Sequence, residues 1–286
     1  MVVTAKSNGT PRHTVDLQPL NKWSVRQTHP VEAPFVLASR VPSNKYLSVV
    51  DAWNAYHSIP LHEEDQDYTQ FATQFGRYRY KKVPQGYLAS GDTYNQRYDA
   101  ILTDFRNKER CVDDTIVYSD TISSSFKDMY RYFIICAENR VVLNPWKFKF
   151  CQQEVEFVGL TVTQDSIKPS QKLINSIMQF PNPKNISDAR AWFGLVEQGS
   201  WAFSRASIMG PFRHLLRPKN KFHWNDELTG LFQLSKKEII RQIVPGVKHF
   251  TPNLPTCLEL ELGFSFFKSI VLVPGTLQPV ANPDGN

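Results

Sequence analysis

Residues 111–118, which read Cys-Val-Asp-Asp-Thr-Ile-Val-Tyr, place two adjacent aspartates inside an apolar strand pattern. Neighbouring side chains of a strand point to opposite faces, so Asp113 and Asp114 are expected on different sides of a sheet or its turn. Two carboxylates held this close raise each other's pKa, and a divalent cation between them relieves the repulsion. Aspartates are also frequent in turns, so a hairpin tip is the alternative interpretation.

A third acid, Asp51, closes the apolar run Tyr46–Val50 and precedes a turn. An acid at the end of a buried strand is poorly solvated and needs a partner. Taken alone, Asp51 is well placed to cap the turn that follows it. Taken with Asp113 and Asp114, it completes a set of three carboxylates suited to two magnesium ions about 3.5–4 Å apart, which activate an attacking hydroxyl and stabilise a leaving pyrophosphate.

The composition narrows the class of protein. The chain has 286 residues, of which 41% are hydrophobic, enough for one large domain or a few small ones. A net charge of +6 is compatible with a polyanionic partner but does not require one. The four cysteines form no C-x-x-C pair, which favours free thiols in a reducing compartment. No apolar run approaches the roughly 18 residues of a membrane helix, so no membrane partner is expected.

The order of elements predicts an α+β fold with antiparallel hairpins rather than a parallel sheet. The dipeptide Asn8-Gly9 predicts a turn between two short N-terminal strands. The first long strand is expected to resume over Ser58–Leu61, and a second hairpin is expected over Tyr68–Phe75 and Tyr78–Val83. Paired strands are expected over Cys151–Thr163. Helical spacing predicts helices over about residues 91–102, 125–139, 172–179, 188–198 and 227–243.

Five blocks resemble, in the same order, the reverse transcriptase of gypsy-like LTR retrotransposons, which is part of a retrovirus-related Pol polyprotein. The blocks are a basic hairpin followed by V-D-x-x-x-L-N in Lys6–Asn21, a strand ending in an acid in Tyr46–Tyr56, a P-Q-G turn in Val83–Gln96, the D-D strand Cys111–Tyr118, and L-N-x-x-K with a hairpin in Leu143–Thr163. The resemblance covers about residues 2–250, and its specificity lies in the order and spacing of the blocks.

The resemblance implies a right-hand polymerase fold with an antiparallel palm sheet, followed by a partial connection and ribonuclease H-like segment. Fingers and palm would cover residues 1–164, the thumb 165–220, the connection 221–255, and a degenerate start of the ribonuclease H-like domain and a tail 256–286. The chain starts at the fingers hairpin, as expected of a truncated fragment. Beyond Glu261 the acids of a ribonuclease H site have no counterpart, so no ribonuclease H activity is expected.

The resemblance also implies an RNA-directed DNA polymerase. Its partners would be an RNA or DNA template with a primer strand, and deoxynucleoside triphosphates. Its cofactors would be two Mg²⁺ ions, with Mn²⁺ as a substitute, held by Asp51, Asp113 and Asp114. Lys147 would act as a general acid toward the leaving pyrophosphate, a role that a positioned lysine can fill.

Substrate contacts follow from the same blocks. Lys6 and Arg12 would reach the triphosphate from the fingers hairpin. This suits their side chains, because arginine binds phosphate through a planar guanidinium and lysine acts as a point charge. Tyr56 would lie under the incoming sugar and exclude a 2′-hydroxyl. Gln85 would hydrogen-bond the nucleotide, and Gly86 would let the backbone approach closely. The alternatives are a solvated hairpin charge for Lys6 and for Arg12, and a core aromatic for Tyr56.

The primer grip would consist of Val158, Gly159 and Leu160. Two places depart from the family pattern: Cys111 stands where many relatives carry Tyr or Phe, and Asn139 and Arg140 replace a glycine-bearing turn expected before the L-N-x-x-K block. In the thumb, Trp192 and Phe193 are expected in the core rather than at a contact surface, because such residues are usually buried.

Two other interpretations stay open on the sequence alone. One is a catalytically weak or inactive transposon-derived remnant that still binds nucleic acid. The other is an unrelated α+β protein that uses the three acids as turn caps.

Overall fold

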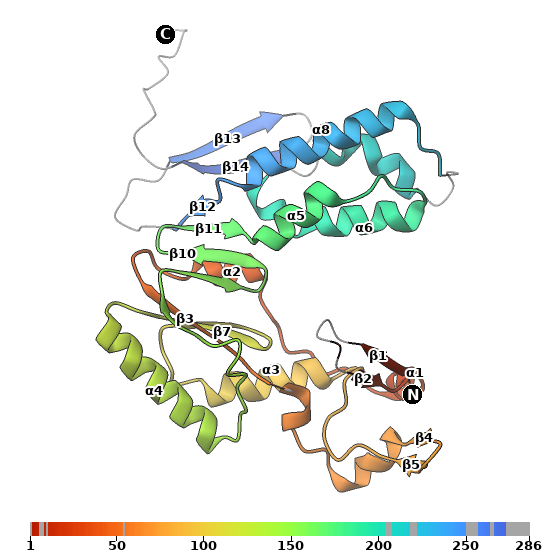
Figure 1. Cartoon of the computed structure of the whole chain (residues 1–286), viewed down its shortest axis with the longest axis vertical. Coiled ribbons are helices and arrows are strands. Elements are labelled where there is room, and N and C mark those ends of the chain that lie inside the picture. The colour runs from red at the N-terminus through yellow and green to blue at the C-terminus, as the bar shows by residue number, and fades with distance from the viewer. Residues whose placement is uncertain are drawn as a thin grey trace. The chain divides into compact units, whose positions relative to one another are not determined.

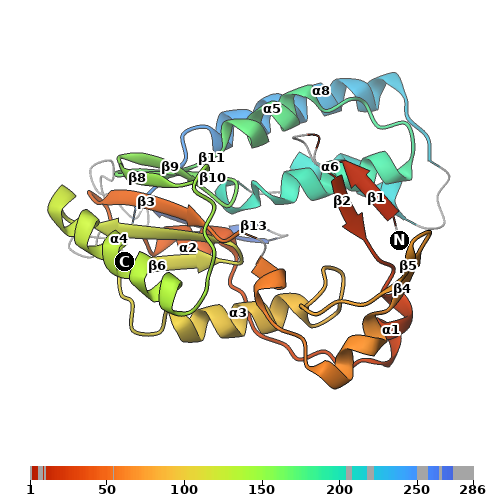
Figure 2. The same cartoon turned by 60° about the horizontal axis from the view of Figure 1, so that its bottom comes forward.

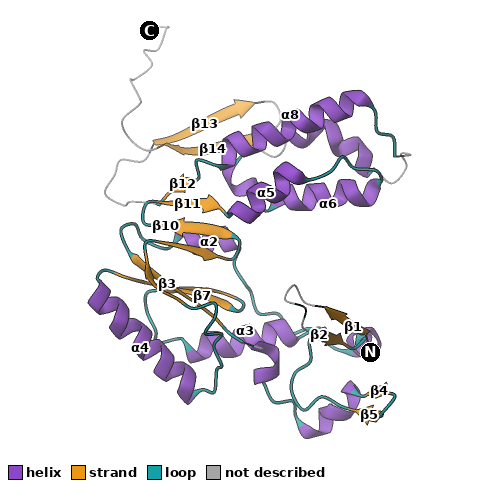
Figure 3. Ribbon diagram, viewed as in Figure 1, coloured by secondary structure: helices purple, strands orange, loops and turns teal. Residues whose placement is uncertain are grey.

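The computed structural model describes residues 2–5, 9, 11–53, 55–203, 208–217, 222–249, 257–263 and 266–272. These residues mix helices with antiparallel strands, which confirms the predicted α+β class (Figures 1 and 3). Two compact units divide the chain, Met1–Ile167 and Lys168–Asn286, and each contains a buried hydrophobic cluster of its own.

A four-stranded antiparallel sheet forms the centre of the first unit, in the order β6-β7-β3-β8. Its strands are β3 (Tyr46–Asp51), β6 (Lys108–Cys111), β7 (Asp114–Ser119) and β8 (Lys149–Gln152). The strand predicted to end at Asp51 is therefore confirmed. It pairs with β7 along its whole length, so that its last residue lies opposite the first residue of β7.

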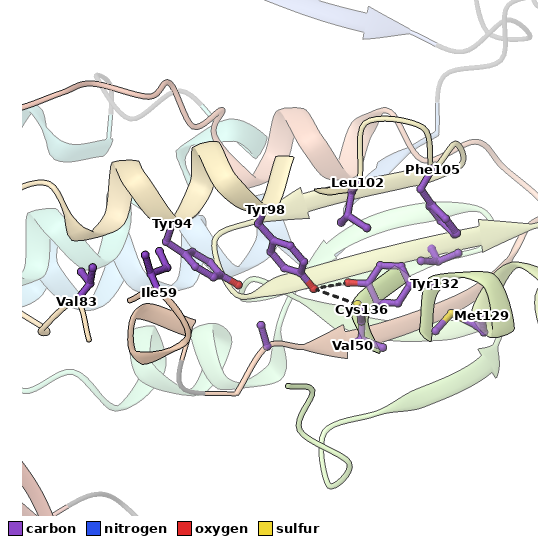
Figure 4. Packing of buried hydrophobic residues seen from close by; sticks show 12 residues of the cluster. Val50, Ile59, Val83, Tyr94, Tyr98, Leu102, Phe105, Met129, Tyr132 and Cys136 are labelled. Carbon is purple, nitrogen blue, oxygen red and sulfur yellow. Dashed lines mark hydrogen bonds between the residues drawn. The ribbon is translucent and has the colours of Figure 1, made fainter. Parts of the chain in front are cut away.

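Helices α3 (Ser90–Ile101) and α4 (Ile122–Glu138) pack against one face of this sheet. Figure 4 shows Tyr98 of α3 facing Tyr132 of α4 above Val50, and the two hydroxyls hydrogen-bond at 2.7 Å. Because side chains alternate along a strand, Val50 points toward these helices and the next residue, the acid that ends β3, points to the other face.

Helix α4 begins three residues before the predicted start at Ser125. Thr121 caps it: the Thr121 Oγ1 atom accepts from the backbone N–H of Ser124, and the Ser124 hydroxyl accepts from the backbone N–H of Thr121. This reciprocal capping box uses serine in place of the usual Glu or Gln, which is why the sequence signal was weak.

The N-terminal hairpin predicted around Asn8-Gly9 is confirmed by β1 (Val2–Ala5) and β2 (Pro11–Thr14), which lie side by side in Figure 2. Two short helices follow that the sequence did not indicate, α1 (Gln18–Trp23) and α2 (Pro34–Ser39). Each has proline in its first turn but only six residues, too few for an apolar period to be recognised.

The second predicted hairpin is much shorter than expected. Its strands are only β4 (Phe71–Thr73) and β5 (Gly76–Tyr78). Upstream of β4 the chain forms a 3-10 helix, η2 (Glu63–Thr69). Thr69 Oγ1 accepts the backbone N–H of Tyr80 at 3.0 Å, so a side chain takes the place of a ladder bond and the strands diverge.

The strand predicted over Ser58–Leu61 is wrong. A 3-10 helix, η1 (Ala55–Ser58), occupies the start of this segment, and the rest contributes one isolated bridge between Pro60 and Lys82. Proline has no N–H to donate, so it cannot extend a ladder on both sides.

The strands predicted within Cys151–Thr163 are confirmed as the hairpin of β9 (Glu154–Phe157) and β10 (Leu160–Thr163). Strand β11 (Ser166–Pro169) follows.

The second unit has its core around Trp192, which is 1% exposed and whose ring centroid lies 4.7 Å from that of Phe232. The prediction that Trp192 belongs to the core is therefore confirmed, whereas Phe193 is only partly buried and packs against the same cluster. The elements of this unit are α5 (Gln171–Gln179), α6 (Ile186–Glu197), η3 (Ser200–Ala202), η4 (Gly210–Leu216), α8 (Asp226–Ile243), β12 (Val247–Lys248), β13 (Cys257–Gly263) and β14 (Phe266–Leu272).

The turn after α4 explains why glycine was expected there. Arg140 has a φ of 57°, and the N–H groups of Arg140 and Val141 donate to the carbonyl oxygens of Ala137 and Cys136. This is a Schellman motif, whose left-handed position is usually glycine. An arginine there pays the steric cost of a left-handed conformation, roughly 1–2 kcal/mol.

We expect Arg140→Gly to stabilise the first unit by about 0.5–1 kcal/mol, because the relief of strain exceeds the extra entropy lost by glycine. The measurement is the urea midpoint followed by circular dichroism. Glu138→Gly is the matched control, since it puts glycine two residues earlier, inside the helix, and should destabilise by about 1 kcal/mol. A lower midpoint for Arg140→Gly than for the wild type would contradict this account.

Candidate polymerase site

The acids predicted to act together meet at one end of the central sheet. Asp51 and Asp114 are directly opposite each other in the β3–β7 pair. Directly opposite residues of an antiparallel pair point to the same face, with Cβ atoms about 4.5–5.5 Å apart. Asp113 belongs to the two-residue turn between β6 and β7. The predicted hairpin turn therefore holds for Asp113, and the predicted strand holds for its neighbour Asp114.

The turn that carries Asp113 is strained. Val112, its first residue, has a φ of 53°, and a β-branched residue in this region is a genuine outlier. Such a conformation costs on the order of 1–3 kcal/mol and persists only when the surroundings enforce it.

The acids disturb one another electrostatically. Burial, followed by the charge of Asp51, raises the pKa of Asp114 to about 6. The same two causes, in the same order, raise the pKa of Asp113. The Oδ1 atom of Asp113 is buried and accepts no hydrogen bond from any described residue. Negative charge is therefore gathered here at a cost in stability.

Lys147 supplies a counter-charge. Its Nζ atom donates to Asp51 Oδ2 at 2.6 Å, and this bond raises the pKa of Lys147, so the ammonium is held protonated at neutral pH. The backbone positions it: the N–H of Asn144 donates to the carbonyl oxygen of Asp51 at 2.8 Å, and the N–H of Ala52 donates to that of Asp113 at 2.9 Å. The L-N-x-x-K block is thus tied to the strand end.

The donor chemistry fits magnesium, although the side chains are not gathered as a coordination shell. Among the described residues, no group of three or more His, Cys, Asp or Glu side chains is arranged to hold a metal ion. What supports a fit is the carboxylate set itself, the orphaned oxygen of Asp113 and the mutual repulsion that a cation would relieve.

Tyr56 lies beside the acids. It belongs to η1, is half-buried, and its ring meets that of Tyr94 edge-on with centroids 5.8 Å apart. Burial and the charge of Asp113 raise its pKa. The ring therefore packs against a core aromatic and also lies close to the acidic turn, by which we mean the Val112–Asp113 turn between β6 and β7. A place in the core and a contact with the incoming sugar are thus compatible for Tyr56.

The P-Q-G turn is held by a residue whose role was not predicted. Gly86 has a φ of 93°, where glycine is favoured. The Nδ2 atom of Asn21 donates to the carbonyl oxygen of Gly86 at 2.9 Å, and the Oδ1 atom of Asn21 accepts from the N–H of Leu88 at 2.8 Å. Gln85, next in the turn, is half-buried. In the sequence, Asn21 is recognisable only as the last residue of the V-D-x-x-x-L-N block.

The predicted primer grip is the turn of the β9–β10 hairpin. Val158 and Gly159 have φ values of 47° and 78°, the signature of a type I′ turn, and Leu160 is buried at the start of β10. Of the two predicted phosphate contacts, Lys6 lies outside the described residues, and Arg12 is placed by its backbone in β2.

Sequence reasoning missed Arg110, which precedes the acidic turn by two residues. Its side chain is only 5% exposed and donates to Asp99 of α3. The signal available was a charged residue at a strand position next to a buried Cys111, a combination that requires a buried partner.

The described helices include none that is long and apolar enough to cross a membrane.

An antiparallel sheet with acids at its strand ends and a lysine bonded to one of them has the form of a polymerase palm. Residues 6–162, more than half of the chain, match the family described as reverse transcriptase (RNA-dependent DNA polymerase). The chain belongs to the reverse transcriptase family.

Relatives among curated proteins are transposon polyproteins. The chain is 26% identical over 243 residues to the retrovirus-related Pol polyprotein from transposon 297 of Drosophila melanogaster, covering 84% of this chain and 23% of that protein. It is 23% identical over 259 residues to the Transposon Tf2-3 polyprotein of Schizosaccharomyces pombe, covering 90% of this chain and 19% of that protein. The chain thus spans about a fifth of the length of the curated relatives it matches.

Solved structures show the same fold. One is the foamy viral protease-reverse transcriptase in complex with dsDNA, at a TM-score of 0.85 and 18% identity, covering 97% of this chain and 58% of that chain. Another is the foamy viral protease-reverse transcriptase in complex with an RNA/DNA hybrid, at a TM-score of 0.75 and 19% identity, covering 90% and 35%. The expected reverse transcriptase fold is confirmed.

We expect Asp114→Asn to be more stable than the wild type near neutral pH, by roughly 1 kcal/mol after allowance for solvent screening. A carboxyl whose folded-state pKa is raised from 3.8 to about 6 makes the wild type lose stability as pH rises through that window. The asparagine variant lacks this loss, so its advantage should shrink toward about pH 4.

The measurement is the unfolding temperature of both proteins across this pH range without divalent cations. Asp165→Asn, at an exposed aspartate in the turn after β10, should follow the wild type throughout. An advantage of Asp114→Asn that does not change with pH would refute the electrostatic explanation.

Proposed function

We propose that this chain carries the polymerase part of an RNA-directed DNA polymerase, which adds deoxynucleotides to a primer by phosphoryl transfer with two Mg²⁺ ions. The observation that carries the proposal is the cross-strand pair of Asp51 and Asp114, with Asp113 in the adjoining turn and Lys147 bonded to Asp51. Family membership and the fold support it.

Asp51, Asp113 and Asp114 would hold the ions, which supply charge neutralisation and a lowered pKa for the primer hydroxyl. Mn²⁺ would substitute, since it accepts the same oxygen ligands. The protein's own task is to position the primer 3′-hydroxyl in line with the α-phosphorus, because phosphoryl transfer needs little other covalent help.

Lys147 would complete the proton balance. The primer hydroxyl would lose its proton to solvent water as the new P–O bond forms, and the bond between the α-phosphorus and the bridging oxygen would break to release pyrophosphate. With the ions bound, Asp51 would hold a metal ion in place of its bond to Lys147, and Lys147 would stay protonated because its pKa is raised. Its ammonium can then donate a proton to the pyrophosphate.

The remaining contacts are assigned by position. Lys6 and Arg12 would hold the triphosphate, Gln85 and Gly86 would contact the nucleotide, and the Val158–Leu160 turn would hold the primer end. A template strand of RNA or DNA, paired with the primer, would bind through its phosphates, so its affinity should fall with salt.

The domain boundaries are part of the same proposal. Residues 1–164 would form fingers and palm, 165–220 the thumb, and 221–255 the connection. Residues 256–286, which include the β13–β14 hairpin, would correspond to the degenerate start of a ribonuclease H-like domain and the tail.

We expect the chain to extend a labelled DNA primer on an RNA or DNA template in Mg²⁺ or Mn²⁺ with deoxynucleoside triphosphates. Asp113→Asn should reduce the rate by at least about 1000-fold, because it removes a ligand charge needed in the transition state. Gel analysis of single-nucleotide addition measures the rate of primer extension for the wild type and for Asp113→Asn.

Duplex binding by the wild type with no extension above the Asp113→Asn background would favour a catalytically inactive nucleic-acid-binding remnant instead. If duplex and Mg²⁺ neither bind to the protein nor stabilise it, the result would point to a protein unrelated in function, because a ligand that binds only the folded state must stabilise that state.

We expect Tyr56→Ala to raise the incorporation of ribonucleotides relative to deoxynucleotides by on the order of 10-fold or more, since loss of the ring opens space for a 2′-hydroxyl. The ratio of kcat/KM for the two substrates measures it. Tyr80→Phe, which keeps an aromatic ring, serves as a control and should keep the wild-type ratio. An unchanged ratio in Tyr56→Ala would assign Tyr56 to the core alone.

A further inference from the structure

A buried arginine lies beside the acidic turn and contacts the turn directly. The Nη1 atom of Arg110 donates to the carbonyl oxygen of Val112 at 2.7 Å. The guanidinium is otherwise bound to α3: Nε and Nη2 donate to Asp99 Oδ1 at 2.8 and 2.6 Å, and Nη1 donates to Asn95 Oδ1 at 3.0 Å. The same group therefore joins the turn to a helix.

The anchor on α3 is well restrained. The guanidinium carbon of Arg110 lies 5.2 Å from the ring centroid of Tyr98, which favours a cation over its face. Nη2 also donates to the backbone carbonyl of Asn95 at 3.2 Å. On its other side Asp99 is engaged by His29, whose Nε2 atom lies 2.7 Å from Asp99 Oδ2. The arginine is thus fixed by charge, by aromatic contact and by a rigid helix.

The carbonyl group that accepts a hydrogen bond from Arg110 belongs to the strained residue of the turn, Val112. Val112 is held at a φ of 53°, which a β-branched residue does not adopt unaided. Its carbonyl belongs to the peptide unit that leads directly into Asp113. A bond that fixes this peptide fixes the direction in which the Asp113 carboxylate leaves the turn.

We infer that Arg110 is a positioning residue for the acidic turn: through Asp99 and Asn95 it ties the Val112 peptide to α3 and so sets the place of the Asp113 carboxylate. The inference rests on the proposed polymerase function for its consequence in catalysis. Arg110 touches neither substrate nor metal in this scheme. A planar fork is required, because the side chain must reach the turn and the helix at once, which a lysine cannot do.

The experiment compares Arg110→Lys with the wild type. Lysine keeps the positive charge but lacks the planar guanidinium group that bonds to the turn and to α3 at the same time. We expect kcat for single-nucleotide addition to fall on the order of 10- to 100-fold, since small displacements of a catalytic group have effects of this size. KM for the deoxynucleotide should change much less. The Mn²⁺ concentration that half-saturates the protein, measured by electron paramagnetic resonance, should rise on the order of 10-fold.

Arg26→Met is the matched control. Arg26 also pairs with an aspartate of α3, Asp92, with Nε at 3.0 Å from Oδ2, and among the described residues it forms no hydrogen bond with the turn. The Arg26→Met variant should keep the wild-type kcat and the wild-type affinity for Mn²⁺. Adding Val112→Gly to Arg110→Lys should restore part of both quantities, because glycine adopts the positive φ without support.

Wild-type kcat and Mn²⁺ binding in a folded Arg110→Lys protein would overturn the inference. So would equal losses in Arg110→Lys and Arg26→Met, which would show only that α3 is destabilised. If Arg110→Lys fails to fold, recovery of folding and Mn²⁺ binding by Val112→Gly supports the inference and no recovery overturns it. If the wild type extends no primer, the proposed function fails, and the Mn²⁺ measurement alone still decides the role of Arg110.

Discussion

The pairing of β3 with β7 is the constraint on which the rest of the first unit depends. It brings Asp51 and Asp114 together although they are far apart in the chain, and it directs both to the face away from α3 and α4. The apolar side chains on the opposite face hold the strands in place, so burial of Val50 and its neighbours is what forces two like charges into proximity. Hydrophobic packing thereby stabilises an arrangement that electrostatics alone would disperse.

Several local features at this end of the sheet carry a cost that the surrounding structure offsets. The Asp114 carboxyl is shifted by burial and by Asp51, Asp113 has a buried oxygen without a partner, and Val112 is in a strained conformation. Unfavourable terms that cluster in one place are typical of functional sites rather than of structural ones. The Lys147 ammonium, bonded to Asp51, offsets part of this cost.

The parts that could be predicted from sequence are those encoded by local pattern. The apolar run before Asp51, the strand around the aspartate pair and the turn at Gly159 each show their structure in a few consecutive residues. The parts that could not be predicted depend on distant partners. A charged residue next to Cys111 in a strand pattern indicates that Arg110 needs a partner, but no neighbouring residue shows that its partners come from α3. The early end of the β4–β5 hairpin depends on a Thr69 hydroxyl that reaches Tyr80.

The register between β3 and β7 has a consequence for how this segment can vary. In a ladder with a two-residue period, inserting or deleting a single residue inside Tyr46–Asp51 reverses the direction of every side chain beyond the change. Asp51 would then turn into the apolar interior while the strand itself persisted. Changes of residue type are tolerable at many of these positions, but changes of length are not, so the spacing between strand start and acid should drift far less than the residues that fill it.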